Sequence, residues 1–279
     1  MLYFLATALL LWPDPSFVSI DYISSIQTIR EPVPVVAIAP PDPPYIENER
    51  LYLPVLDDVL DRYWPDIPDR SWVAAQIRQE TCYSLRHSKC WSPNAELKTE
   101  REYGFGLGQL TITEKFNNFI EAKKLDSSLS SWEWEDRYNP EYQIRTMVLM
   151  LKFNYGKFSW ASSERERMAF SFAAYNGGVG GVLSDRRVCM AEDWCDPSIW
   201  FYHVEKTSRK SKKPVNGYSK SFFQINREYV RNIMIKYPDR YRYYFYNETE
   251  NVFYYEGKNS GVFICRRYFY YPDNRVTLL

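Results

Sequence analysis

A glutamate on an apolar helical stripe is the first residue in this chain that could do chemistry. In the stretch SWVAAQIRQETC, Val73, Ile77 and Glu80 fall on one helical face, so position 80 is expected to point inward or into the wall of a cleft. A carboxyl group partly removed from water has a raised pKa and keeps its proton near neutral pH, as a general acid requires. Periodicity alone favours the alternative, a glutamate at a helix end that pairs with a nearby arginine.

Two glycine-rich segments follow Glu80 along the chain. GFGLGQL at residues 104–110 holds three of the 11 glycines, and AYNGGVGG at residues 174–181 holds four more. Because glycine has no Cβ, such segments can approach a ligand closely and offer it their backbone amides and carbonyls. Gln109 can both donate and accept hydrogen bonds, which suits an acetamido sugar. The spacing matches neither a dinucleotide-binding fingerprint nor a phosphate-binding P-loop.

Four segments in order, AAQIRQETC, GFGLGQLT, AAYNGG and REYV, resemble the motifs of lytic transglycosylases of the soluble-lytic (SLT) type. The resemblance covers roughly residues 55–235 and implies a mainly α, lysozyme-like domain. Glu80 matches the single catalytic glutamate of that family. The positions that match its substrate-binding segments are Gly106, Leu107, Gln109, Tyr175, Asn176 and Tyr229.

The chain departs from the family pattern at several positions. Thr81 replaces the usual serine after the glutamate, and Gly108 replaces the usual methionine, which predicts a more open cleft floor. The segment between Glu80 and the first glycines is longer than usual. A cleft serine is typical of this segment, and Ser92 and Thr99 are both candidates for it.

The resemblance implies cleavage of the MurNAc–GlcNAc β-1,4 bond in peptidoglycan glycan strands. Glu80 would protonate the glycosidic oxygen, and the N-acetyl oxygen of the substrate would stabilise C1. Glu80 would then take the proton of the C6 hydroxyl, which closes a 1,6-anhydro ring without water. The reaction needs no metal and no organic cofactor.

Three alternatives to a transglycosylase remain open at this point. A hydrolytic muramidase would need a second carboxylate, for which Glu100 and Glu102 are the nearest candidates. A glycan-binding protein with an inactive site is the second alternative, although the intact Glu80 argues against it. A cysteine peptidase built on Cys82 and His203 has no supporting motif.

The cysteine spacing predicts two short disulfides. Close pairs are separated by eight and six residues, and a fifth cysteine is left over; the five lie at Cys82, Cys90, Cys189, Cys195 and Cys265. Such pairs are typical of an oxidising compartment. Five free thiols are the alternative, and a zinc site that adds His87 to the first pair matches no standard spacing.

The elements that must position these residues are mostly helices. Helical stripes are expected from about residue 50 to Tyr63 and, behind Asp69 or Ser71 as a cap, through residue 80. The clearest helix is residues 139–156, with an asparagine cap and Pro140 at its first position. Ser163 and Glu166 predict a capping box before residues 167–178, and a last helix should run from residue 226 to Pro238.

Composition divides the chain into four parts. Residues 1–12 are apolar and uncharged, which predicts an export signal or a shallow membrane anchor rather than a buried segment; residues 13–47 are a proline-rich linker. Residues 48–237 are the lysozyme-like domain, and residues 238–279 are an aromatic-rich tail expected to form two strands around a glycine-containing turn. The basic stretch at residues 205–214 is expected to be a solvated loop. Because the net charge is zero, the chain as a whole has no electrostatic attraction to nucleic acid. The predicted location is the periplasm or the membrane at the cell wall.

Overall fold

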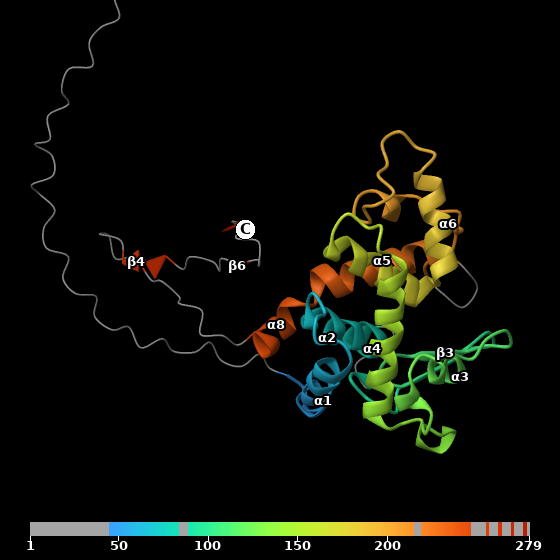
Figure 1. Ribbon diagram of the computed structural model, residues 1–279, viewed down its shortest axis with the longest axis vertical. Helices are drawn as coiled ribbons and strands as arrows, with labels where there is room; N and C mark the ends of the chain where they lie inside the picture. The colour runs from blue at the N-terminus through green and yellow to red at the C-terminus, as the bar shows by residue number, and fades with distance from the viewer. Residues whose placement is uncertain are drawn as a thin grey trace, which may run out of the picture. The chain divides into compact units, whose positions relative to one another are not determined.

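The computed structural model describes residues 45–83, 89–214 and 219–246, together with the backbone of four two-residue strands beyond them. This part of the chain is mainly α, as predicted (Figure 1). The α-helices of the described residues are α1 Glu47–Tyr63, α2 Arg70–Arg78, α3 Asn118–Lys123, α4 Pro140–Lys157, α5 Glu164–Gly177, α6 Val179–Cys189, α7 Phe222–Arg231 and α8 Asp239–Phe245.

Helix α4 runs through the middle of the body and contacts α1 and α5 (Figure 1). The helix begins where it was predicted to begin. The Asn139 side chain accepts hydrogen bonds from the backbone amides of Glu141 and Tyr142. Pro140 fits the first position because the backbone N–H that it lacks would have no partner within the helix. Its predicted inner face is buried, with Ile144, Met147, Val148 and Leu151 all fully inaccessible. The helix therefore forms the centre of the apolar core that supports the site.

A three-stranded antiparallel sheet lies between α2 and α3 in the sequence, where no strand was predicted. Its order is β1 Glu96–Lys98, β2 Tyr103–Phe105 and β3 Leu110–Ile112. Strands of three residues are too short to show an alternating pattern in the sequence. The first glycine segment is thereby placed in β2 and in the turn that joins β2 to β3.

The predicted capping box at α5 forms only in part. Ser163 Oγ accepts a hydrogen bond from the Glu166 backbone, as expected. The Glu166 carboxylate does not close the capping box, however. It accepts instead from the backbone amides of Trp200 and Phe201 at 2.8 and 3.1 Å. These amides are buried, and a buried N–H needs an acceptor more than an exposed helix cap does.

The second glycine segment is a helix junction and not a long loop. Gly178 has φ +75° and separates α5 from α6 directly. A Cβ atom on Gly181 would lie 3.2 Å from Lys210 Nζ, and one on Gly177 would lie 3.7 Å from Lys210 Cε. Gly181 therefore makes room for Lys210, whose ammonium reaches the buried Asp185 carboxylate at 2.9 Å. Gly177 instead makes room for Asn226, because a Cβ atom there would lie 2.9 Å from Asn226 Nδ2.

The basic stretch at residues 205–214 begins inside the body, which corrects the prediction of a solvated loop for its first half. Glu205 is buried and pairs with Arg231, and Thr207 donates to a backbone carbonyl of α6. Residues 211–214 are exposed, as expected. These partners decide which residues of the stretch are buried. The composition of the stretch does not reveal them.

Helix α8 packs onto the body through Tyr241. This side chain is fully buried, donates to the Glu49 carboxylate at 2.7 Å and accepts from the Trp91 ring nitrogen at 3.1 Å. Arg240 also pairs with Glu49. The helical body therefore includes residues 239–245, which the sequence analysis placed in the aromatic tail.

The four strands beyond the helical body belong to a separate unit. In it, β4 Tyr255–Glu256 pairs antiparallel with β5 Val262–Phe263, in agreement with the predicted pair of strands. A second antiparallel pair, β6 Phe269–Tyr270 with β7 Val276–Thr277, was not predicted. The apolar segment 1–12, the linker up to residue 44, His87 and Cys265 lie outside the described residues. Within the part of the chain that is described, no helix is long and apolar enough to cross a membrane.

Candidate active site

Glu80 lies in a single π-helical turn, η1 Gln79–Tyr83, that continues α2. The next residue fixes this turn, because Thr81 Oγ1 donates to the Ile77 carbonyl at 2.7 Å and accepts from the Trp91 amide at 2.9 Å. π-Turns inside helices occur frequently at functional sites. The wider turn sets the direction in which Glu80 leaves the helix.

Both predicted disulfides are present, Cys82–Cys90 and Cys189–Cys195. The first lies two residues after Glu80 and ties the π-turn to the segment that precedes the sheet. A sulfur atom in a disulfide is not a thiolate, so it is neither a nucleophile nor a zinc ligand. In this structure Cys82 therefore serves neither the peptidase nor the zinc alternative.

The Glu80 carboxyl is partly buried, as its stripe predicted, and lies near the hydroxyls of Tyr229 and Tyr175. Its Oε1 accepts a hydrogen bond from the Tyr229 hydroxyl at 2.6 Å. Burial raises the pKa of Glu80 to about 8, and the hydrogen bond from Tyr229 opposes this increase. The arginine two residues earlier, Arg78, pairs with Glu49 instead. Glu80 is therefore mainly protonated at neutral pH, as a general acid must be.

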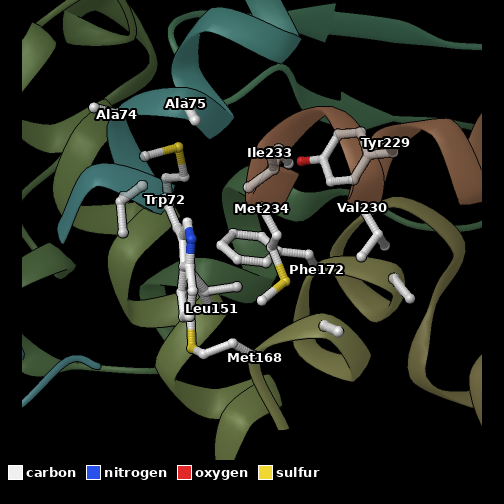
Figure 2. Close-up of a cluster of buried hydrophobic side chains, with 14 of the residues drawn as sticks. Trp72, Ala74, Ala75, Leu151, Met168, Phe172, Tyr229, Val230, Ile233 and Met234 are labelled. Carbon is white, nitrogen blue, oxygen red and sulfur yellow. The ribbon is translucent and has the colours of Figure 1, made fainter. Parts of the chain in front are cut away.

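Tyr229 reaches Glu80 from the core. It is 2 % exposed and lies beside Val230 and Ile233 in the buried cluster that also contains Trp72 of α2 (Figure 2). Burial and the nearby Glu80 raise the pKa of Tyr229 well above its ordinary value, so its hydroxyl keeps its hydrogen. The late tyrosine of the sequence motif is thus brought to the glutamate, as predicted.

Tyr175 links α5 to the first glycine segment. Its hydroxyl donates to the Gly108 carbonyl at 2.7 Å, and burial with the nearby Glu80 raises its pKa well above the ordinary value. A Cβ atom on Gly108 would lie 2.8 Å from this hydroxyl and 3.1 Å from Met147 Cβ. Gly108 therefore makes room for Tyr175 and Met147, which corrects the expectation of a more open cleft floor.

Asn176 is exposed, and a buried neighbour orients its side chain. Asn226 Nδ2 donates to Asn176 Oδ1 at 3.0 Å and to the Ala173 carbonyl at 2.9 Å, while Arg227 holds the Asn226 oxygen. Asn226 and Arg227 are both buried. Asn226 was not predicted from the sequence, because a polar residue in a helix gives no sign of which partner it meets.

Gln143 organises the first glycine segment and was also missed. Its side-chain oxygen accepts from the Leu107 amide at 2.9 Å, and its nitrogen donates to the carbonyls of Pro93 and Arg137. Gly106 has φ +78°, and a Cβ atom there would lie 2.4 Å from Gln143 Cδ. A signal existed, since a glutamine four residues before Met147 lies on the apolar face of α4.

The side chains of Leu107 and Gln109 stabilise the segment itself. Leu107 is fully buried in the core. Gln109 has φ +44°, and its amide nitrogen donates to the carbonyls of Gly106 and Ala95 at 2.8 and 3.2 Å. The roles of Gly106, Leu107 and Gln109 in substrate binding stay predictions.

Glu102 belongs to the turn between β1 and β2, a different element from the one that carries Glu80. The Thr99 hydroxyl accepts from the Glu102 amide at 3.1 Å, and the Thr99 amide donates to the Glu102 carbonyl at 2.9 Å. The Ser92 hydroxyl accepts from the Asn94 amide at 3.3 Å. Both candidates for the cleft serine therefore take part in local turns.

Comparison with known proteins supports the motif-based resemblance. No protein-family model matches the chain. The membrane-bound lytic murein transglycosylase F of Shewanella denitrificans is 26 % identical over 148 residues, which are 53 % of this chain and 24 % of the relative. The crystal structure of the 70 kDa soluble lytic transglycosylase SLT70 from Escherichia coli aligns with a TM-score of 0.40 and 24 % identity, over 67 % of this chain and 24 % of that one. This chain thus spans about a quarter of the length of each protein it matches. Over that span, the sequence similarity confirms the predicted resemblance to lytic transglycosylases.

Proposed function

We propose that this chain is a peptidoglycan lytic transglycosylase that cleaves the MurNAc–GlcNAc β-1,4 bond and leaves 1,6-anhydro-MurNAc ends. The observation that carries the proposal is the Glu80 carboxyl, whose pKa burial raises to about 8 and whose Oε1 accepts the Tyr229 hydroxyl. A carboxylic acid that keeps its proton at neutral pH can protonate a poor leaving group. Similarity to a murein transglycosylase supports peptidoglycan as the substrate.

One carboxyl suffices for this reaction because the substrate supplies the nucleophiles. Glu80 donates its proton to the glycosidic oxygen as the C1–O bond breaks, and the MurNAc N-acetyl oxygen stabilises C1. The resulting Glu80 carboxylate accepts the C6 hydroxyl proton while O6 bonds to C1. Glu80 regains its proton in this step, and no water is consumed.

Two further parts of the proposal concern binding and location. Asn176 is exposed beside Tyr175, and Asn226 fixes its orientation, so its amide is available to a sugar acetamido group. The disulfides Cys82–Cys90 and Cys189–Cys195 favour an oxidising compartment, which supports export to the periplasm. Export signal or membrane anchor remains the proposed role of residues 1–12.

The mass of the product tests the reaction. We expect digestion of purified sacculi in ¹⁸O-labelled water to give anhydro-muropeptides, one water lighter than hydrolytic products and free of label. Glu80→Gln should give no products, and Glu102→Gln should give the wild-type ones. Label at the new MurNAc end in the wild type would contradict the lyase assignment, and its loss in Glu102→Gln would make Glu102 the water-activating carboxylate. Sacculus binding without any product would instead support an inactive glycan-binding protein.

A further inference from the structure

Gln76 forms the inner end of a three-residue hydrogen-bond chain that leads to Glu80. It is fully buried and lies four residues before Glu80 in α2. Its amide nitrogen is 3.0 Å from the Tyr229 hydroxyl oxygen, and that oxygen is 2.6 Å from Glu80 Oε1. Gln76 lies inside the segment AAQIRQETC, but no role was predicted for it.

With the Gln76 amide nitrogen facing Tyr229, the direction of this chain is fixed. A side-chain amide nitrogen can only donate, so the Tyr229 oxygen accepts from Gln76 and its own hydrogen is left for Glu80. The line between Tyr229 and Glu80 Oε1 then contains the tyrosine hydrogen. The tyrosine hydrogen thus occupies the space between the two oxygens, so a carboxyl proton of Glu80 must sit on Oε2.

We propose that Gln76 is a positioning residue that, through Tyr229, keeps the acid proton of Glu80 on Oε2. Without Gln76, the Tyr229 hydroxyl can rotate away, and the Glu80 proton can settle between Oε1 and the tyrosine oxygen. A proton held there is not available to a leaving group. The catalytic consequence rests on the proposed function, whereas the proton arrangement does not.

The Gln76 side-chain oxygen raises an alternative, in which the oxygen and the nitrogen of the amide exchange places. It is buried, and among the described residues it has no hydrogen-bond partner. An amide turned the other way would present this oxygen to Tyr229, draw the tyrosine hydrogen away from Glu80 and let the Glu80 proton point at Tyr229 instead. The two orientations give opposite effects of removing Gln76, which makes them distinguishable.

In the proposed orientation, removing Gln76 raises the pKa of Glu80. The ionised carboxylate loses a donor that strengthens the Tyr229 hydrogen bond, and the protonated form gains a second position for its proton. In the reversed orientation, the protonated form loses its support and the pKa falls.

Other titratable and charged groups also lie near Glu80. Tyr175 faces it from α5 and Tyr229 from α7, and both keep their hydrogens because their pKa values lie well above the ordinary range. Lys220 and Lys236 contact the Tyr83 ring in the same π-turn, and Lys220 is paired with Glu228. A change in the Glu80 titration therefore reports on the chain through Tyr229.

The test is the titration of Glu80 in Gln76→Met and in a matched control. Gln79→Met also removes a buried amide from the same helical segment, but the Gln79 side-chain oxygen accepts from Asn232. Carbon-13 NMR of the glutamate side chains, with the Glu80 signal assigned by its loss in Glu80→Gln, gives the pKa. We expect an increase of about 0.5–1 pH unit in Gln76→Met and a clearly smaller change in Gln79→Met. A decrease, or equal shifts in both variants, would overturn the proposal.

Two further measurements complete the test. In the wild type, the Gln76 side-chain amide ¹⁵N signal should titrate with the midpoint of Glu80, and this response should vanish in Tyr229→Phe; a Gln76 signal that ignores pH would contradict the chain without any variant of Gln76. On sacculi, kcat of Gln76→Met should fall about tenfold with KM unchanged, and Gln76→Met should add nothing in a Tyr229→Phe background. Inactive wild type with an intact NMR response would refute the proposed function alone.

Discussion

At Glu80, the apolar surroundings that favour acid catalysis also make the ionised residue costly for the fold. Its pKa of about 8 lies above the value of 4.5 for an exposed glutamate. Between these two pH values, the unfolded chain has lost the proton that the folded chain still binds. The contribution of Glu80 to stability is therefore fully present below about pH 4.5 and is lost as the pH rises to about 8, at about 1.4 kcal/mol per pH unit.

Glu80→Gln should remove this pH dependence. We expect the unfolding free energy of the variant, relative to the wild type, to increase by a few kcal/mol (~2–4) between pH 5 and pH 8, because a glutamine does not ionise. Urea denaturation at the two pH values measures this difference. The same relative stability at both pH values would contradict a buried, protonated Glu80.

At the scale of elements, two glycines with positive φ have different structural roles in this chain. Gly106 and Gly178 have similar φ values, +78° and +75°. A Cβ atom on Gly106 would lie 2.4 Å from Gln143, whereas one on Gly178 would meet nothing within 4 Å. The first glycine thus provides a close approach between α4 and the sheet, and the second provides only a backbone conformation.

Alanine at these two positions separates the two effects. Gly178→Ala should cost about 1 kcal/mol of unfolding free energy, for placing an alanine at positive φ. Gly106→Ala should cost several kcal/mol more (~2–3), because Gln143 must also move and lose buried hydrogen bonds. Chemical denaturation of both variants under the same conditions gives the difference. Equal losses would show that Gln143 gives way freely.

At the scale of the whole molecule, α8 belongs to the helical body, although its composition resembles the tail. Tyr241 joins α8 to Glu49 of α1 and to Trp91 beside the Cys82–Cys90 disulfide. Glu49 is fully buried, and Arg78 and Arg240 also bind it. Removing α8 would leave a buried carboxylate with fewer partners and an open space above Trp91.

Two truncations test this boundary. A chain that ends at residue 246 keeps all described residues of the helical body and is compared with the full chain. A chain that ends at residue 237 should be strongly destabilised, by about 3–5 kcal/mol, because it loses a fully buried tyrosine and exposes the Glu49 network. Differential scanning calorimetry of the three chains measures the effect. Similar stability of the two truncated chains would place α8 outside the body.

The sequence by itself determined the features that depend on a few neighbouring residues. The apolar stripe and cap of α4, the inward position of Glu80 and the two short disulfides all follow from local spacing. The order of the four motifs pointed to the resemblance, and with it to Tyr175 and Tyr229. Such signals survive in the sequence because each one lies within a turn or two of helix or within one short loop.

Only the tertiary structure decided what those residues touch. The three-residue strands, the π-turn under Glu80, the buried amides of Gln143 and Asn226 and the close contact of Lys210 with Gly181 were decided by segments far apart in the sequence. Periodicity indicates that a side chain faces inward, but it does not identify the partner, which depends on how helices pack. The direction of the hydrogen bonds from Gln76 to Glu80 arises in the same way, because α7 brings Tyr229 between them.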